Sequence, residues 1–221
     1  MTAIDAGQPR DPNHLGHRPG AHVDHAPGHG DGGPASKRIV VGFGFWIFLL
    51  SDIVMFSAFF AAFAVLSGNT AGGPSGKQLF DLNEVAIETA CLLASSFTCG
   101  LASLAAAARY KIKFYAAMTV TGLLGATFLG LELHEFIGLV ARGAGPQRSA
   151  FLSSFFTVVG CHGLHVTIGL LWLGTMMAQV YAKGFRSDIL RRMMCFSLFW
   201  HALDIIWVAL FTVVYLMGMV Q

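Results

Sequence analysis

The sequence predicts an all-α protein, a polytopic membrane protein built as a bundle of five transmembrane helices. Of its 221 residues, 55% are hydrophobic and only 12% are charged, whereas a soluble domain carries about 25% charged residues. The mean hydropathy is +0.63, and the apolar residues fall in long runs that each reach the roughly 20 residues needed to cross a bilayer core. The net charge of +2 gives no reason to expect a nucleic-acid partner.

Residues 1–36 differ in composition from the rest of the chain. They are rich in Gly, Pro, Asp and His, as in "HVDHAPGHGDGG", and such a segment cannot bury enough apolar surface to fold. We therefore expect a disordered tail over 1–36 and a transmembrane domain over 37–221. A His-rich tract can bind metal, but the histidines of this tail show no defined ligand spacing, so adventitious binding or no role is expected. They are His14, His17, His22, His25 and His29.

Five hydrophobic segments make up the rest of the chain. Gly and Pro residues typical of turns separate the first from the second in "SGNTAGGPSGKQLFDL" and the third from the fourth in "ARGAGPQRSA". The other two connections, "RYKIK" and "AKGFRSDILRR", carry charge. Most segments exceed the minimal span, so tilted helices or projecting ends are expected. The expected helices cover about 39–66, 83–108, 114–140, 151–181 and 193–220.

The basic residues predict how these helices are oriented. Eleven of the fourteen Lys and Arg residues lie in the tail with the start of the first helix, in the second connection and in the fourth connection. The first and third connections hold only Lys77, Arg142 and Arg148. Because Lys and Arg collect in cytoplasmic loops, we expect the N-terminus in the cytoplasm and the C-terminus on the opposite side, as five crossings also require.

Several ionisable residues fall inside the expected spans, where each needs a buried partner, a cavity or a function. The first span carries Asp52 within "WIFLLSDIVMFSAFF". The other candidates are Glu88 in the second span, Glu132 and Glu135 in the third, His162 and His165 in the fourth, and His201 and Asp204 in the fifth.

Spacing indicates which of these residues share a helix face, because residues three or four apart are neighbours on a helix. One reading is a metal site. A low-spin haem needs two histidines on opposite sides, which adjacent turns of one helix cannot readily supply, although His201 could in principle oppose His162 or His165. A di-iron centre needs Glu-x-x-His motifs on two helices, and "ELHE" has no second copy. The favoured reading is an interhelical network of imidazole and carboxylate hydrogen bonds. The predicted pairs are Glu132 with Glu135, His162 with His165, and His201 with Asp204.

Asp52 is a separate case, because no basic residue lies in its own span. One hypothesis makes it a structural, neutral carboxyl group that is hydrogen-bonded inside the bundle. The other makes it a group that contacts water and passes protons. Both hypotheses fit the sequence.

Taken together, these motifs resemble subunit III of the haem-copper terminal oxidases. The likeness runs from about Gly42 to Met219. Asp52 takes an acidic position that is glutamate in many members, and Trp207 completes a last-helix triplet with His201 and Asp204. The five-helix length and "GPQRSAFLSSFF" resemble the bo-type ubiquinol oxidase branch. The matching stretches, in order, are "GFWIFLLSDIVMFSAFFAAFAVL", "ETACLLASS", "GLELHEF", "GCHGLHVTIG" and "FWHALDIIWVALFTVVYLMG".

This resemblance implies an accessory subunit of a proton-pumping quinol oxidase in a bacterial inner membrane. It implies no catalytic residue, cofactor or metal on this chain, because the haems and copper of the family lie in subunit I. Subunit I is then the main partner, beside subunits II and IV, and phospholipid is expected in a cleft between the helices. The family treats the matching polar residues as packing, lipid-cleft or proton-related positions.

Three alternatives stay open at the level of sequence. The chain could be subunit III of a cytochrome c oxidase. It could be a stand-alone proton-coupled transporter, although the paired inverted repeats common in transporters are missing. It could be a small membrane metalloenzyme that uses its histidines.

Overall fold

The computed structural model describes residues 37–72 and 82–216, with the side chains of 37 and 38 excepted. The chain divides into two units, Met1–Ala35 and Ser36–Gln221, and the described residues all belong to the second. The predicted tail over 1–36, with its five histidines, therefore lies outside the described residues. So does Lys77 in the first connection.

Within the described residues, five helices are long and apolar enough to cross a membrane, and no strand is present. This confirms the predicted all-α, five-span fold. Each helix has 24 to 34 residues, so each exceeds the roughly 20 residues of a minimal span. The helices are α1 (Lys37–Leu66), α3 (Leu82–Ala107), α4 (Lys111–Ala141), α5 (Ala150–Lys183) and α6 (Ser187–Leu210), which continues as a π-helix, η1 (Phe211–Leu216).

The last span begins earlier than the sequence suggested, at Ser187 instead of Met193. The charged run was expected to form a loop, but Gly184, with φ of 68°, already ends α5 and lets the chain turn. Asp188 lies in the first turn of α6, where a negative charge favours the helix dipole. The long Arg side chains that follow can extend to the membrane surface from a helical position.

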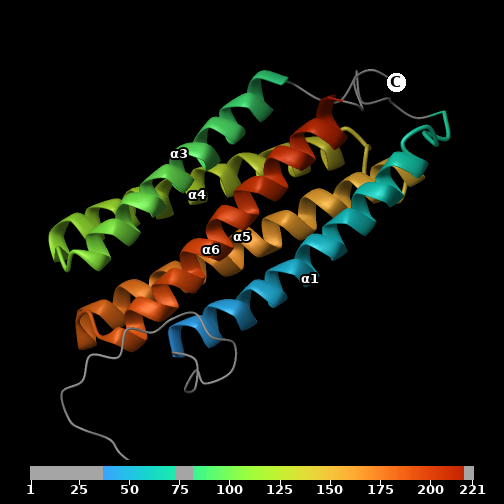
Figure 1. Ribbon diagram of the computed structural model, residues 1–221. Helices are drawn as coiled ribbons and strands as arrows, with labels where there is room; N and C mark the ends of the chain where they lie inside the picture. The colour runs from blue at the N-terminus through green and yellow to red at the C-terminus, as the bar shows by residue number, and fades with distance from the viewer. Residues whose placement is uncertain (1–36, 73–81, 217–221) are drawn as a thin grey trace, which may run out of the picture. The chain divides into compact units, whose positions relative to one another are not determined.

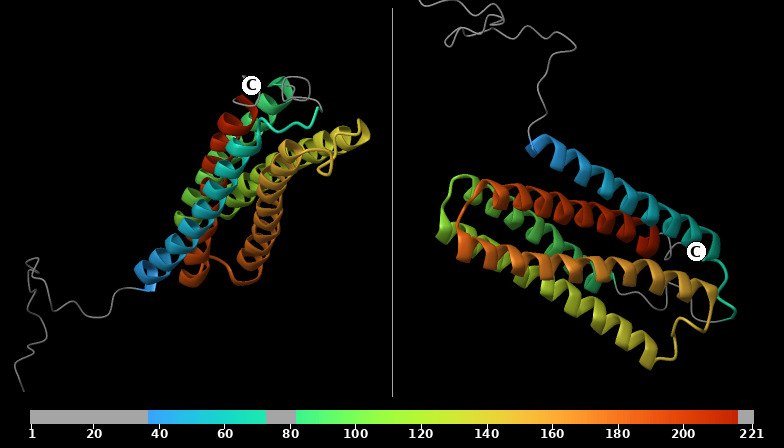
Figure 2. Two further views of the ribbon diagram at one scale, coloured as in Figure 1. Left: turned by 90° about the vertical axis from the view of Figure 1, so that its right-hand side faces the viewer. Right: turned by 90° about the horizontal axis from the view of Figure 1, so that it is seen from below.

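The middle of the helical unit is formed by α5 and α6, with the α3–α4 hairpin on one side and α1 on the other (Figure 1, Figure 2). The α1 helix packs mainly on α5 and α6, and α3 packs on α4 and α6. Most of the large apolar side chains of α1 stay exposed, such as Phe43 and Val54. This exposure suits a helix that faces lipid or another protein.

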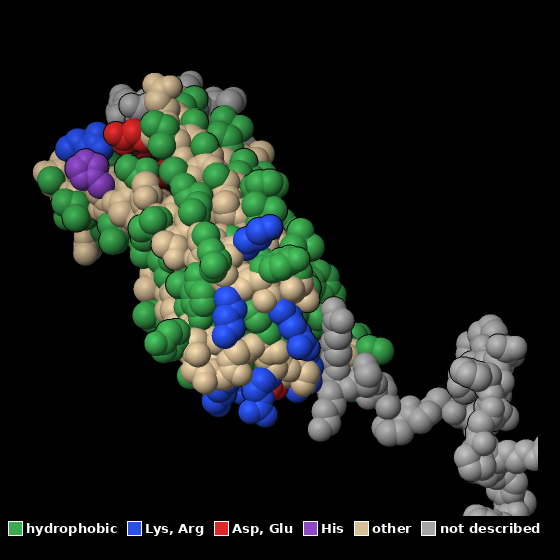
Figure 3. Space-filling model, turned by 90° about the vertical axis from the view of Figure 1, so that its left-hand side faces the viewer, with side chains coloured by type: hydrophobic (Ala, Val, Ile, Leu, Met, Phe, Trp, Pro, Cys, Tyr) green, Lys and Arg blue, Asp and Glu red, His purple; other side chains and the backbone are tan. Residues whose placement is uncertain are grey.

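Two clusters of buried apolar side chains fill the space between the helices. One centres on aromatic rings, among them Phe128 and Trp207. The other includes Phe114, Met176 and Trp200. Outside, apolar side chains extend along the helices, while Lys and Arg gather toward one end of the face seen in Figure 3. A band of apolar surface with charge confined to the ends is typical of a bilayer-spanning protein.

Candidate functional site

The polar residues of α6 are tied to hydroxyl groups of α3. Each of the three bonds crosses between the two helices and joins side chains more than 100 positions apart in sequence. Hydroxyls on one helix and aromatic or imidazole nitrogens on the other thus form a polar seam inside the membrane. The bonds are Trp200 Nε1 to Ser95 Oγ at 3.1 Å, Trp207 Nε1 to Thr89 Oγ1 at 3.0 Å, and Ser96 Oγ with His201 Nδ1 at 2.6 Å.

His201 and Asp204 share one face, as their spacing predicted, and both line a hollow between α3 and α6. Ser96 faces both side chains. Asp204 Oδ1 is buried and has no hydrogen-bond partner among the described residues. This cluster is therefore incomplete within the described part of the chain.

A second polar cluster contains three glutamates from two helices. Glu88 on α3 and Glu132 on α4 are 1% and 2% exposed. They lie close enough to each other and to Glu135 for their charges to interact. Tyr215 of η1 donates its hydroxyl hydrogen to Glu135 Oε2 at 2.9 Å. The carboxyl of Glu132 lies against Gly163 of α5, where an added Cβ would be 2.6 Å from Oε1.

The two histidines of "GCHGLH" have different environments, although both face Phe56 of α1. His162 is fully buried against the ring of Trp207, with ring centroids 5.2 Å apart. Neither of its ring nitrogens has a hydrogen-bond partner in the described ranges. His165 donates from Nδ1 to the carbonyl oxygen of Cys161 at 2.7 Å. In 37–72 and 82–216, no group of three His, Cys, Asp or Glu residues is arranged to hold a metal ion.

Asp52 lies on α1 and is partly buried. Its carboxyl group is near enough to Cys161 of α5 for the two side chains to interact electrostatically. It thus borders the α1–α5 contact where His165 also lies. Its neighbour Ser51 donates its hydroxyl hydrogen back to the carbonyl oxygen of Phe48 at 2.6 Å. The structural and proton-handling roles of Asp52 both stay hypotheses.

Sequence reasoning pointed to small residues on the helix faces but did not show which large side chain packs against them. Trp200 of α6 fits against Gly125 of α4 and Gly169 of α5, where an added Cβ would lie 3.0 and 2.9 Å from the indole ring. The hydroxyls of α3 that form the seam were also missed. Their signal was the spacing of Thr89, Ser95 and Ser96 near one face of a helix whose other residues are mostly apolar or small.

Comparison with known proteins places this arrangement in a family. The family described as cytochrome c oxidase subunit III matches residues 29–219. The chain belongs to the cytochrome c oxidase subunit III family. The resemblance predicted from the motifs is therefore confirmed, and the whole described bundle lies inside the matched range.

Individual relatives of this subunit III chain carry two kinds of name. Cytochrome bo(3) ubiquinol oxidase subunit 3 of Pseudomonas aeruginosa is 52% identical over 98% of both chains. Quinol oxidase subunit 3 of Bacillus subtilis is 46% identical over 80% of this chain and 86% of its own length. Cytochrome c oxidase subunit 3 of Bacillus sp. strain PS3 is 43% identical over the same shares.

Proposed function

We propose that this chain is the accessory, non-redox subunit III of a proton-pumping haem-copper ubiquinol oxidase in an aerobic respiratory chain. The observation that carries the proposal is the identity of 52% over 98% of both chains to a cytochrome bo(3) ubiquinol oxidase subunit 3. In such a complex this chain supports quinol oxidation coupled to dioxygen reduction, without itself holding the reacting atoms.

The site geometry supports a structural role for the polar residues. Nε1 of Trp200, Nδ1 of His201 and Nε1 of Trp207 are each hydrogen-bonded to a hydroxyl of α3. Buried polar groups that are paired across helices fix the register of those helices, because a shifted register would leave them unpaired in hydrocarbon. By fixing how α3 and α6 lie against each other, the seam gives the bundle a defined outer surface for contact with other subunits or lipid.

The partners we propose are subunit I, as the main contact, and subunits II and IV of the same complex, together with membrane lipid. Subunit I would hold the haems and copper, and a phospholipid would bind in a cleft between the helices of this chain. The exposed apolar length of α1 supports this view, because another subunit or lipid must cover such a surface inside the complex.

We place the chain in the bacterial inner membrane, with its N-terminus in the cytoplasm and its C-terminus in the periplasm. The α3–α4 turn contains Arg109, and Lys111 begins α4. At the same end, Lys183 closes α5 and Arg186 lies in the α5–α6 turn. Lys and Arg favour the cytoplasmic side, so this charge distribution supports the orientation.

A second candidate function, as subunit III of a cytochrome c oxidase, differs only in the electron donor, which would be cytochrome c instead of quinol. The identity of 43% to a cytochrome c oxidase subunit 3 favours this alternative, while the quinol oxidase relatives favour quinol. The two candidates make opposite predictions about which reductant the intact complex consumes.

The experiment is to purify the chain by a C-terminal tag from membranes in mild detergent and assay oxygen consumption of the eluate. We expect much larger subunits to co-purify and ubiquinol to be oxidised rapidly, with reduced cytochrome c oxidised slowly or not at all. Rapid oxidation of cytochrome c alone would support the second candidate. A chain that elutes without partners and takes up solute in liposomes would contradict both.

A further inference from the structure

A groove runs along the outer surface of the α3–α4 hairpin. Its volume is about 580 Å³, within the roughly 300–1,000 Å³ of small-molecule sites. Its walls include Leu101 and Leu104 of α3 and Ala117 and Val120 of α4. Leu104 is 68% exposed and Val120 43%, so the groove opens outward, where a bilayer surrounds the helices. We call it the α3–α4 groove.

The charged end of the groove is the turn between the two helices. Tyr110 and Lys113 line it there, and Lys113 Nζ is 5.1 Å from the centroid of the Tyr110 ring. Arg109 and Lys111 lie in the same turn. No Asp or Glu occurs in 89–131, and in the described ranges no acidic side chain forms an ion pair with any of the three cations. This end of the groove is therefore positively charged and not neutralised by the described part of the chain.

The rest of the groove needs no hydrogen bond from an occupant. The polar residue that lines it there is Thr98, whose hydroxyl donates to the carbonyl oxygen of Ser95 at 2.9 Å and lies 2.7 Å from Thr121 Oγ1. From Thr98 to Ala108, at 1.5 Å per residue, the α3 wall is about 15 Å long. This length is half of a hydrocarbon core of about 30 Å, which is one leaflet. A transmembrane helix would cross both leaflets, whereas a phospholipid is charged at one end and apolar along one leaflet.

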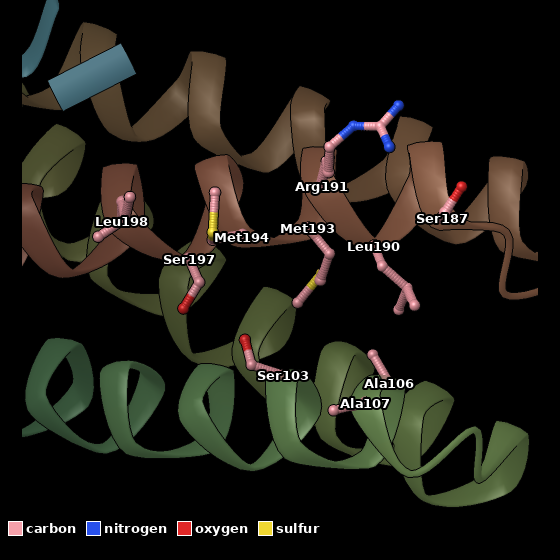
Figure 4. A pocket seen from close by; sticks show the side chains of 10 residues that line it. All are labelled: Ser103, Ala106, Ala107, Ser187, Leu190, Arg191, Met193, Met194, Ser197 and Leu198. Atoms are coloured by element: carbon pink, nitrogen blue, oxygen red, sulfur yellow. The ribbon is translucent and has the colours of Figure 1, made fainter. Parts of the chain in front are cut away.

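A second hollow beside α3 lacks this combination. It has a volume of about 500 Å³ and lies between α3 and α6 (Figure 4). Its charged lining residue is Arg191, whose guanidinium points away from α3 in Figure 4. Ser103 Oγ is buried on its wall without a hydrogen-bond partner in the described ranges. The α3–α4 groove is thus the better match to an anionic lipid.

We infer that the α3–α4 groove binds one anionic phospholipid of the cytoplasmic leaflet, with its phosphate beside Lys113 and one acyl chain between Leu104 and Val120. The inference rests on the proposed function, whose orientation puts this turn in the cytoplasm, and it names the class and place of a bound lipid. The cytoplasmic leaflet carries anionic lipids, and basic pockets between helices on that side bind their headgroups. The long side chain of Lys113 can reach the headgroup level, and tyrosines such as Tyr110 are enriched at that level.

The first test uses the intact, tagged complex in bilayer discs and two photoreactive lipids. One is a phosphatidylglycerol and the other a phosphatidylcholine, each with the photoreactive group halfway along an acyl chain. After illumination, the labelled residues are located by mass spectrometry. We expect the phosphatidylglycerol to label 98–108 and 116–120, and the phosphatidylcholine to label them about five-fold less, as the loss of one favourable charge interaction predicts.

The second test compares two lysines at the start of α4. Lys113 lines the groove and Lys111 does not. We expect Lys113→Gln to lower labelling by phosphatidylglycerol about five-fold, whereas Lys113→Arg keeps the charge and retains the labelling. Lys111→Gln is the matched control and should also retain it. Equal labelling of the two glutamine variants would show that no headgroup binds at Lys113.

The third test fills the groove at an exposed alanine. Ala116 and Ala126 are both exposed on α4, but only Ala116 lines the groove. We expect Ala116→Phe to abolish labelling of the groove while the partner subunits are retained. Ala126→Phe should leave the labelling unchanged. Undiminished labelling of the Ala116→Phe variant would overturn the inference.

The outcomes separate this inference from the proposed function. Equal labelling by the two lipids, in a complex that keeps its haem-bearing partner, overturns the anionic-lipid site and leaves the subunit role intact. A cross-link from a photoreactive residue at Leu104 to another polypeptide also overturns it, because a protein then covers the groove. Failure of the unsubstituted chain to co-purify with any haem-bearing partner overturns the proposed function itself, and the lipid labelling is then measured on the chain as purified.

Discussion

Trp200 brings together contacts from four helices, and Gly169→Ala tests whether those contacts hold the bundle. The indole ring lies on α6 against glycines of α4 and α5, and its Nε1 donates to Ser95 Oγ of α3 at 3.1 Å. At Gly169, an added Cβ would be 2.9 Å from Cζ3 of Trp200 and 3.3 Å from Phe199. The ring is only 2% exposed, so it has little room to move away.

Overpacking of this kind costs about 1–3 kcal/mol, which is a factor of roughly 5 to 150 in a folding equilibrium. Gly174→Ala is the matched control on the same helix, because an added Cβ there meets nothing within 4 Å. Both variants gain the helix propensity of alanine, up to about 1 kcal/mol. The difference in unfolding free energy between Gly169→Ala and Gly174→Ala therefore measures the effect of the contact with Trp200.

The assay is reversible unfolding of the purified protein in mixed micelles, followed by the loss of helical circular dichroism. We expect Gly169→Ala to unfold at lower denaturant than Gly174→Ala. Equal midpoints for the two variants would refute the close packing of Trp200 against α5.

Three further substitutions probe other contacts by the same assay. Thr89→Val leaves the indole N–H of Trp207 without its acceptor at 3.0 Å and should lower the free energy of unfolding by about 1–3 kcal/mol. Adding Trp207→Phe to Thr89→Val should then cost less than Trp207→Phe costs by itself, whereas additive costs would rule out this hydrogen bond. Gly163→Ala places a Cβ 2.6 Å from Glu132 Oε1 and should lower the free energy of unfolding. This loss should be smaller when Glu132→Ala is also present, and an unchanged loss would exclude the contact. Tyr215→Phe removes the hydroxyl that donates to Glu135 at 2.9 Å and should lower the free energy of unfolding by about 1 kcal/mol. Tyr181 is 86% exposed, so Tyr181→Phe is the control and should cause no measurable loss.

The fold could be predicted because the apolar runs are long and the bilayer sets a minimum length for each helix. Every described helix overlaps its expected range, and the largest shift is the start of α6 at Ser187. That start was missed because the charge in this run was taken as a sign of a loop. Near a membrane surface, charged side chains are also compatible with a helix end.

The polar site could be predicted only within single helices. Helical periodicity placed His201 and Asp204 on one face, and both line the same hollow. Periodicity does not say which helix lies opposite, so Ser96 as the neighbour of both side chains could not be inferred. Likewise, the contact of Gly163 with Glu132 could not be inferred from the sequence, because it depends on how α4 crosses α5.

The most direct test of the account is the haem and copper content of this chain before and after it is separated from its complex. The tagged complex is purified, its reduced-minus-oxidised spectrum and metal content are recorded, and the partners are then stripped with stronger detergent. An accessory subunit predicts haem bands and copper in the complex and neither in the released, still helical chain. Stoichiometric haem, iron or copper that stays with the released chain, even after residues 1–36 are deleted, would contradict it.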